Sequence, residues 1–214
     1  MFEITLSFDN GPEPGVTPGV LDTLAKAEIG ATFFVLGRKI AEPAHTLLME
    51  RAADEGHWIG NHTYTHQTPL GLSADPKVAE AEVGRTQALI GSLSHPDRLF
   101  RPFGDGGLIG PHLMNRTVAE YLKHHGFTCV LWNEVPRDWD DPEGWAATDL
   151  EACRQRTWSL LVLHDLPTGA MLHLERFIND VRVAGGRFRQ DYPPDCMPIL
   201  RGQEVLPLTN YVTE

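Results

Sequence analysis

The chain has 214 residues, of which 42% are hydrophobic and 22% charged, a composition typical of a folded globular protein rather than a disordered or fibrous one. Its 18 basic and 29 acidic residues give a net charge of -11, which repels polyanions and argues against a nucleic-acid partner. No apolar run approaches the roughly 20 residues that a membrane-spanning helix needs, so we expect a protein that is neither inserted into a membrane nor exported.

The predicted elements alternate between strand and helix along the chain. Short apolar runs rich in β-branched and aromatic residues predict strands at 2–8, 31–36, 57–60, 99–101, 127–132 and 159–163. Apolar residues at helical spacing predict helices around 21–24, 47–52, 118–122 and 174–181. Thr17 and Asp141, each followed by proline, are typical of helix N-caps. Such alternation with short connections predicts a mostly parallel sheet covered by helices, either open or closed into a barrel.

The cysteine content favours a reducing compartment. Cys129, Cys153 and Cys196 are an odd number with no spacing typical of metal ligands, so we expect reduced thiols and a cytoplasmic protein. A chain of this length can bury one sizeable core, which predicts a single catalytic domain over residues 1–214. The oligomeric state is not indicated by the sequence.

Six polar side chains follow the predicted strands at or just beyond their carboxyl ends. They are Asp9, His62, His66, Arg101, Asp138 and His164. Because the carboxyl ends of parallel strands share one face, we expect these side chains to assemble a site there.

Five short segments carry these residues. They are 7–12 (SFDNGP), 61–66 (NHTYTH), 99–104 (LFRPFG), 132–139 (WNEVPRDW) and 161–165 (LVLHD). In this order they resemble the motifs of the polysaccharide deacetylase family, also called carbohydrate esterase family 4. The resemblance implies a distorted parallel β/α barrel with fewer strands than the eight-fold form. It also implies hydrolysis of N-acetyl groups on sugars with the help of a divalent metal.

The first two segments resemble the base and the metal ligands of the family. Asp9 matches the general base, and Asn10 stands where the family has a second, metal-binding aspartate, so the site has one negative charge fewer. His62 and His66, four residues apart, match the family's histidine pair. Two such imidazoles converge on one ion if the intervening residues form a helical turn. The resemblance therefore implies a divalent metal, with zinc as the expected ion, bound by Asn10, His62 and His66.

The third segment supplies a partner for the base. By resemblance, Arg101 pairs with Asp9, and a guanidinium in this position fixes the direction of the carboxylate. The backbone N–H of Phe103 is the oxyanion donor that the resemblance implies. The stretch from Asp105 to His112 that follows is either part of the substrate pocket or a surface loop.

The last two segments resemble the acid side of the mechanism. His164 matches the family's general acid, and Asp138 matches the aspartate that orients it and raises its pKa. Trp139 and Leu163 match residues that line the acyl pocket. Asp165, next to the acid, is expected to be a helix cap or a turn residue.

Together these residues predict a hydrolase that releases an acyl group from an N-acylated sugar or a related small amide by metal-assisted acid–base catalysis. A small soluble carbohydrate is the expected partner, because chitin and peptidoglycan lie outside the cytoplasm. Two alternatives stay open. One is a metal-independent hydrolase of cyclic amides, similar to allantoinases, and the other is an inactive relative that only binds.

Overall fold

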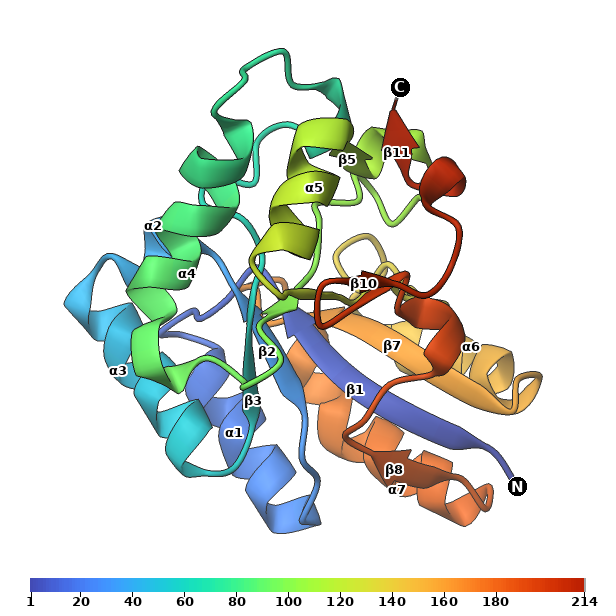
Figure 1. The fold of residues 1–214 in the computed structure, drawn as a ribbon. Helices are drawn as coiled ribbons and strands as arrows, with labels where there is room; N and C mark the ends of the chain where they lie inside the picture. Colours follow the sequence, from blue (N-terminus) through green and yellow to red (C-terminus); the bar gives the residue numbers. More distant parts are fainter. Residues whose placement is uncertain (214) are drawn as a thin grey trace.

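A curled sheet forms the centre of the computed structural model, which describes residues 1–213 (Figure 1). Its strand order is β10-β9-β6-β4-β3-β2-β1-β7, with β8 paired beside β1. The strands are β1 (Glu3–Asp9), β2 (Thr32–Val35), β3 (Trp58–Asn61), β4 (Leu99–Phe100), β6 (Thr128–Cys129), β7 (Trp158–His164), β8 (Arg187–Arg189), β9 (Ile199–Leu200) and β10 (Gln203–Glu204). Two further short strands, β5 (Met114–Asn115) and β11 (Val212–Thr213), pair with each other.

The central strands are parallel, and only β9 and β10 run antiparallel to their neighbours. An isolated bridge between Glu134 and Leu161 brings the segment after β6 against β7, so the sheet curls toward closure. This architecture confirms the predicted distorted parallel β/α barrel.

Helices cover the outside of the curled sheet (Figure 1). The α-helices are α1 (Thr17–Ala27), α2 (Gly37–Ile40), α3 (Pro43–Asp54), α4 (Arg85–Ile90), α5 (Arg116–His124), α6 (Trp145–Arg154) and α7 (Leu174–Val183). A π-helix, η2 (Ala79–Gly84), leads directly into α4. Short 3-10 turns are η1 (Leu70–Leu72), η3 (Gly91–Leu93), η4 (Pro111–Leu113), η5 (Ala170–His173), η6 (Pro194–Cys196) and η7 (Leu208–Asn210). Within residues 1–213, no helix combines the length and the apolar character that crossing a bilayer requires.

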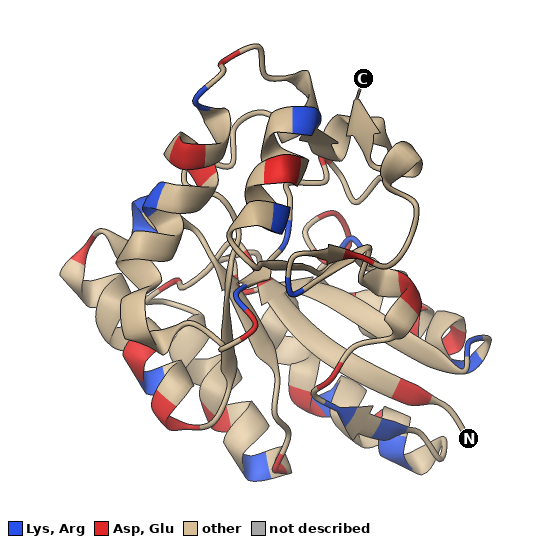
Figure 2. Cartoon of the chain, viewed as in Figure 1, with Lys and Arg blue, Asp and Glu red and all other residues tan. Residues whose placement is uncertain are grey.

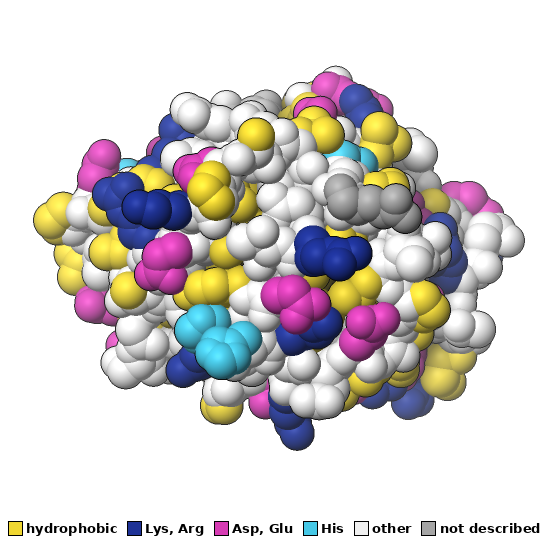
Figure 3. Space-filling model, turned by 45° about the horizontal axis from the view of Figure 1, so that its top comes forward, with side chains coloured by type: hydrophobic (Ala, Val, Ile, Leu, Met, Phe, Trp, Pro, Cys, Tyr) yellow, Lys and Arg dark blue, Asp and Glu magenta, His cyan; other side chains and the backbone are white. Residues whose placement is uncertain are grey.

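Charged residues lie mainly on the covering helices and loops, whereas the central strands contain few of them (Figure 2). On the face shown in Figure 3, acidic, basic and apolar side chains of the described residues are interspersed. The net negative charge therefore does not form a single acidic patch on this face.

The two sides of β1 explain where the site forms. Ile4, Leu6 and Phe8 are fully buried and pack outward against the helices in the largest apolar cluster. The alternate residues of this strand, which include Ser7 and Asp9, face the inside of the curl because successive side chains of a strand point to opposite faces. The inside of the barrel is consequently polar at the carboxyl end of β1.

An apolar layer closes the barrel interior below these polar groups. It consists of Phe34, Leu99, Val130 and Leu160, one from each of four strands or strand ends, with Tyr192 and Cys196. Burying these side chains together removes the water that would otherwise compete for the polar groups above them.

Both predicted N-caps are wrong. Helix α1 begins at Thr17 itself, and α6 begins three residues after Asp141-Pro142, at Trp145. The Thr17 hydroxyl donates to the carboxylate of Asp165, and the Asp141 carboxylate accepts from the backbone N–H of Gly144 at 3.0 Å. Because these side chains are engaged by these partners, neither of them caps its helix. Short polar side chains often form such hydrogen bonds in place of helix caps.

Candidate active site

One pocket of about 200 Å³ opens at the carboxyl ends of the parallel strands. Seven residues singled out from the sequence line it: Asp9, Asn10, His62, His66, Phe103, Trp139 and His164. Arg101 and Asp138 are fully buried and contact Asp9 and His164 respectively. The fold therefore gathers side chains from five separate segments into one site, as parallel α/β topology favours.

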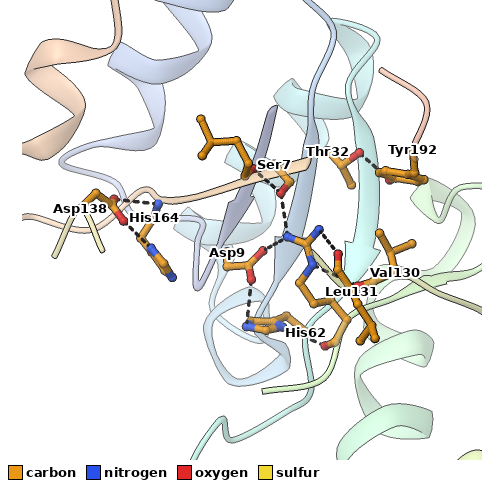
Figure 4. Close-up of polar contacts among 11 residues, drawn as sticks. Ser7, Asp9, Thr32, His62, Val130, Leu131, Asp138, His164 and Tyr192 are labelled. Carbon is orange, nitrogen blue, oxygen red and sulfur yellow. Dashed lines mark hydrogen bonds and ion pairs between the residues drawn. The ribbon is translucent and has the colours of Figure 1, made fainter. Parts of the chain in front are cut away.

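The buried Arg101 guanidinium holds the carboxylate of Asp9, which Figure 4 shows between Ser7 and His62. Its Nη1 donates to Asp9 Oδ1 at 2.9 Å and to Ser7 Oγ at 2.7 Å. Its remaining donors reach the backbone carbonyls of Val130 at 3.2 Å and Leu131 at 3.1 Å. The buried positive charge is thus paired and hydrogen-bonded, which is the condition under which such a charge is tolerated. Asp9 is held in one direction as a result.

The tautomer of His62 follows from its neighbours. Its Nδ1 lies 2.9 Å from the carbonyl oxygen of Arg101, and a carbonyl can only accept, so Nδ1 carries the hydrogen. Burial is the main cause that lowers the pKa of His62, so the ring is neutral. Its Nε2 therefore presents a lone pair toward Asp9 Oδ2, 3.5 Å away. Two acceptors facing each other favour a cation or a water hydrogen between them.

His66 reaches the same pocket without a helical turn between the two histidines. The residues between the two histidines do not form a helical turn; Thr63 and His66 both have left-handed φ angles, 68° and 52°. The rings still come together, with centroids 4.8 Å apart. Burial is the main cause that lowers the pKa of His66 to about 2, so this imidazole is neutral as well.

Asn10 completes a set that suits a divalent ion. Its side-chain oxygen is buried and has no hydrogen-bond partner within the described residues. An orphaned carboxamide oxygen costs about 1–3 kcal/mol, which a bound cation would offset. Within residues 1–213 no three His, Cys, Asp or Glu side chains are grouped to hold a metal. The donors present, two neutral imidazoles and this oxygen, fit a metal with positions left open for water and substrate.

The acid side of the pocket is a histidine–aspartate pair. His164 Nδ1 lies 2.7 Å from Asp138 Oδ1, and the His164 backbone N–H donates to Oδ2 at 3.0 Å. Burial alone lowers the pKa of His164, but the hydrogen bond and charge of Asp138, with further negative charge from Asp9 and Asp165, raise it overall. The Trp139 ring stands edge-on to the imidazole, 4.7 Å between centroids.

The rim of the pocket comes from the segment after β4. The Phe103 ring packs on His66 with centroids 3.9 Å apart, and within residues 1–213 no protein acceptor takes the Phe103 N–H. Asp105, Gly106 and Gly107 also line the pocket, so the first part of the 105–112 loop belongs to the site. The indole N–H of Trp132 donates to the carbonyl of Gly107 at 2.9 Å, and this bond fixes the position of the loop.

The prediction for Leu163 is wrong. Leu163 is fully buried in the outer apolar cluster and does not line the pocket. It is the register partner of Phe8, just as His164 is the partner of Asp9. Because His164 faces the pocket, the side chain two residues earlier, Val162, shares that face and lines the pocket in its place.

Asp165 is a site residue that the sequence did not reveal. It is fully buried rather than a cap or turn residue, and its Oδ2 accepts from the hydroxyl of Thr17. Burial raises its pKa to about 7. A Cβ placed on Gly11 would lie 2.2 Å from its carboxylate oxygens, so Asp165 supports the backbone next to Asn10. Its position directly after His164 was the only signal in the sequence.

Comparisons with known proteins agree with this geometry. Residues 2–130 match the sequence model of a family described as polysaccharide deacetylase. A chitooligosaccharide deacetylase of Rhizobium leguminosarum is 33% identical over 76% of this chain and 71% of its own. A peptidoglycan-N-acetylglucosamine deacetylase of Bacillus cereus is 32% identical over 76% and 72%. The structure of a family 4 acetyl xylan esterase from Clostridium thermocellum with a cobalt ion superposes with a TM-score of 0.70 and 26% identity, covering 88% of this chain and 87% of that one.

Proposed function

Since the chain belongs to the polysaccharide deacetylase family, we propose that it is a hydrolase that removes the acyl group from an N-acylated sugar. One observation carries this proposal: Asp9 and His164 are register partners on adjacent parallel strands. Their side chains therefore share one face, and each has its own buried positioning partner, Arg101 for Asp9 and Asp138 for His164. A base and an acid set beside each other in one pocket are what amide hydrolysis requires.

Asp9 is the general base in this proposal. Arg101 occupies Asp9 Oδ1, so Oδ2, which faces His62, is the oxygen left to accept a proton from the attacking water. The Phe103 N–H is the donor for the oxyanion that forms on the acyl carbon. A divalent cation held by Asn10, His62 and His66 supplies Lewis acidity, which polarises a carbonyl and makes water more acidic. Zinc is the ion that we predict.

His164 is the general acid. Its Nδ1 is engaged by Asp138, so Nε2 is the atom that delivers a proton to the departing nitrogen. A protonated amine leaves far more readily than an amide anion, which is why the raised pKa of His164 suits this role.

The substrate that we propose is a small N-acetylated amino sugar or its short oligomer. The similar proteins named above act on chitooligosaccharide and on peptidoglycan N-acetylglucosamine, as their names state. The pocket is small, about 200 Å³, and its apolar wall of Val135, Trp139 and Val162 suits a short acyl group. A cytoplasmic location stays a prediction from the sequence.

The test is acetate release from N-acetylglucosamine and its oligomers by the wild type, Asp9→Asn and His164→Ala. We expect each substitution to lower kcat/KM by ~10²–10⁴-fold, the usual contribution of a general base or acid. Asp22→Asn and His124→Ala are matched controls, because both side chains are exposed on outer helices. Absence of acyl release from every substrate, or equal activity in the site variants and their controls, contradicts the proposal.

A further inference from the structure

The loop between the two histidines has a backbone conformation that is energetically unfavourable without support from other residues. Thr63 and His66 adopt left-handed φ angles of 68° and 52°, a region that threonine in particular avoids. Such residues cost about 1–3 kcal/mol each and persist only where the surroundings impose them. The direction of the His66 imidazole depends on this bend, so whatever imposes the bend places His66 in the pocket.

Glu82 makes three hydrogen bonds to the middle of this loop. Its Oε2 accepts from the backbone N–H of Tyr64 at 2.9 Å and of Thr65 at 2.8 Å. Its Oε1 accepts from the Thr65 hydroxyl at 2.8 Å. Hydrogen bonds to a carboxylate are about twice as strong as neutral ones. Both backbone amides directly before His66 are thus bound to a single side chain.

The other hydrogen bonds of the loop lie at its beginning and at the carbonyl of Tyr64, which accepts from the Arg38 N–H at 3.1 Å. The Asn61 carboxamide accepts from the Thr63 N–H at 3.0 Å and donates to the Val83 carbonyl at 2.9 Å. The carbonyl of Thr63 accepts from the Gly37 N–H at 3.0 Å. These bonds hold residues 61–64, and the Phe103 ring packs on His66 itself. Glu82 is the side chain that binds the two backbone amides directly before His66.

The element that carries Glu82 is itself unusual. Glu82 lies on the π-helix η2, in which the Arg85 N–H bonds to the carbonyl of Glu80 five residues earlier. This wider turn lets neighbouring residues reach the loop together, the Glu82 carboxylate at its middle and the Val83 carbonyl at Asn61. Single π turns are frequently found at functional sites.

We propose that Glu82 is the positioning residue for the histidine pair: its carboxylate imposes the bend of residues 62–66 and thereby aims His66 beside His62. The inference deepens the proposed function, on which it rests for its link to metal affinity. Partners that orient metal-binding histidines from outside the ligand set typically change metal affinity by ~10–100-fold.

Three variants of the full chain test this role. Glu82→Ala removes all three bonds, and Glu82→Gln keeps an oxygen acceptor without the charge. Glu80→Ala is the matched control, because Glu80 lies on the same π-helix but bonds to the Tyr121 hydroxyl, at 3.0 Å. The readouts are hydrogen exchange of the Tyr64 and Thr65 amides, the ¹⁵N shifts of the His66 ring, and the Kd for Co²⁺.

In Glu82→Ala we expect lost protection of both amides, altered ring shifts of His66, and a Co²⁺ Kd that rises ~10–100-fold. Glu82→Gln should be intermediate and Glu80→Ala unchanged. If Glu82→Ala does not fold, Glu82→Gln alone decides by the same readouts. Exchange and ring shifts equal to those of Glu80→Ala would overturn the inference. A wild type that neither binds Co²⁺ nor releases acyl groups contradicts the proposed function instead, and the two metal-free readouts still decide the role of Glu82.

Discussion

The Asp138 carboxylate holds His164 at two points, with Oδ1 2.7 Å from the ring Nδ1 and Oδ2 3.0 Å from the backbone N–H. The first contact fixes the tautomer of the ring and the second fixes the strand end that carries it. A histidine held in this way has one free nitrogen, Nε2, whose direction is set by the contact of Nδ1 with the Asp138 carboxylate.

Asp138→Asn should weaken the acid and shift its pH range. The substitution removes the main influence that raises the pKa of His164, so the pKa falls and activity is lost at a lower pH than in the wild type. We expect kcat at pH 7 to drop by ~10²–10⁴-fold. The pH–rate profile of both proteins measures this, and a basic limb at the same pH in both would contradict the assignment.

The same pair makes a stability contribution with a defined sign. Because the folded pKa of His164 lies above its ordinary value of 6.5, its contribution is fully present below pH 6.5 and is lost as the pH rises through the folded pKa. The wild type should therefore lose more stability than Asp138→Asn between pH 6 and pH 9, as urea unfolding at each pH would measure. Equal losses in the two proteins would show that the pair does not titrate as described.

Arg101→Met should destabilise the fold as well as abolish activity. Removing the guanidinium leaves the Asp9 carboxylate buried without its charge partner, which typically lowers the free energy of unfolding by ~3–5 kcal/mol. The control is Arg154→Met, which breaks an exposed pair with Glu151 and should change stability by about 0.5 kcal/mol or less. Urea unfolding of both variants measures the difference, and similar values would mean that the buried pair contributes nothing.

Gly11→Ala should disturb the pocket without removing any side chain from it. The added Cβ would lie 2.2 Å from the Asp165 carboxylate, so either this side chain or the backbone beside Asn10 must move. Overpacking of this kind costs about 1–3 kcal/mol. Gly15→Ala is the control, because a Cβ there meets nothing within 4 Å. We expect reduced acyl release and weaker Co²⁺ binding in the first variant only; equal Co²⁺ affinity in both would contradict the supporting role of Asp165.

Asn10→Asp should strengthen metal binding. Asn10 has a left-handed φ of 72°, which aspartate tolerates as well as asparagine does, so the change adds a charge without new backbone strain. An anionic oxygen beside two neutral imidazoles attracts a dication more strongly than an amide oxygen. We expect the Kd for Zn²⁺ and Co²⁺ to fall by at least ~10-fold, as titration calorimetry would measure. An unchanged Kd would show that this side chain is not a ligand.

The alternation of strands and helices predicted a mostly parallel sheet covered by helices, and the resemblance of five short motifs to the family predicted the barrel and most of the pocket. A reactive residue at the end of a parallel strand reaches the shared face whatever the loops do, and this places Asp9 and His164 correctly. The side of the sheet that Leu163 faces was not predictable in the same way. Residues 160–163 are all apolar, so the alternation that separates the two faces of a strand is hidden.

The support of the site comes from contacts that no local pattern contains. Glu82 is 17 residues from Thr65 in the chain, and Asp165 is 148 residues from Thr17. Neither contact follows from helical or strand periodicity, because each depends on how distant segments pack. The two histidines come together without a helical turn for the same reason, since the loop conformation follows its tertiary hydrogen bonds.

The most direct test of the account is acyl release from N-acetylglucosamine oligomers before and after chelation of the wild type, followed by addition of Zn²⁺ or Co²⁺. We predict release that the chelator abolishes and that either ion restores, as expected if His62, His66 and Asn10 hold a metal beside Asp9. Release that the chelator leaves untouched, or that occurs only with cyclic amides, would contradict the metal-assisted mechanism and would assign these side chains to substrate binding.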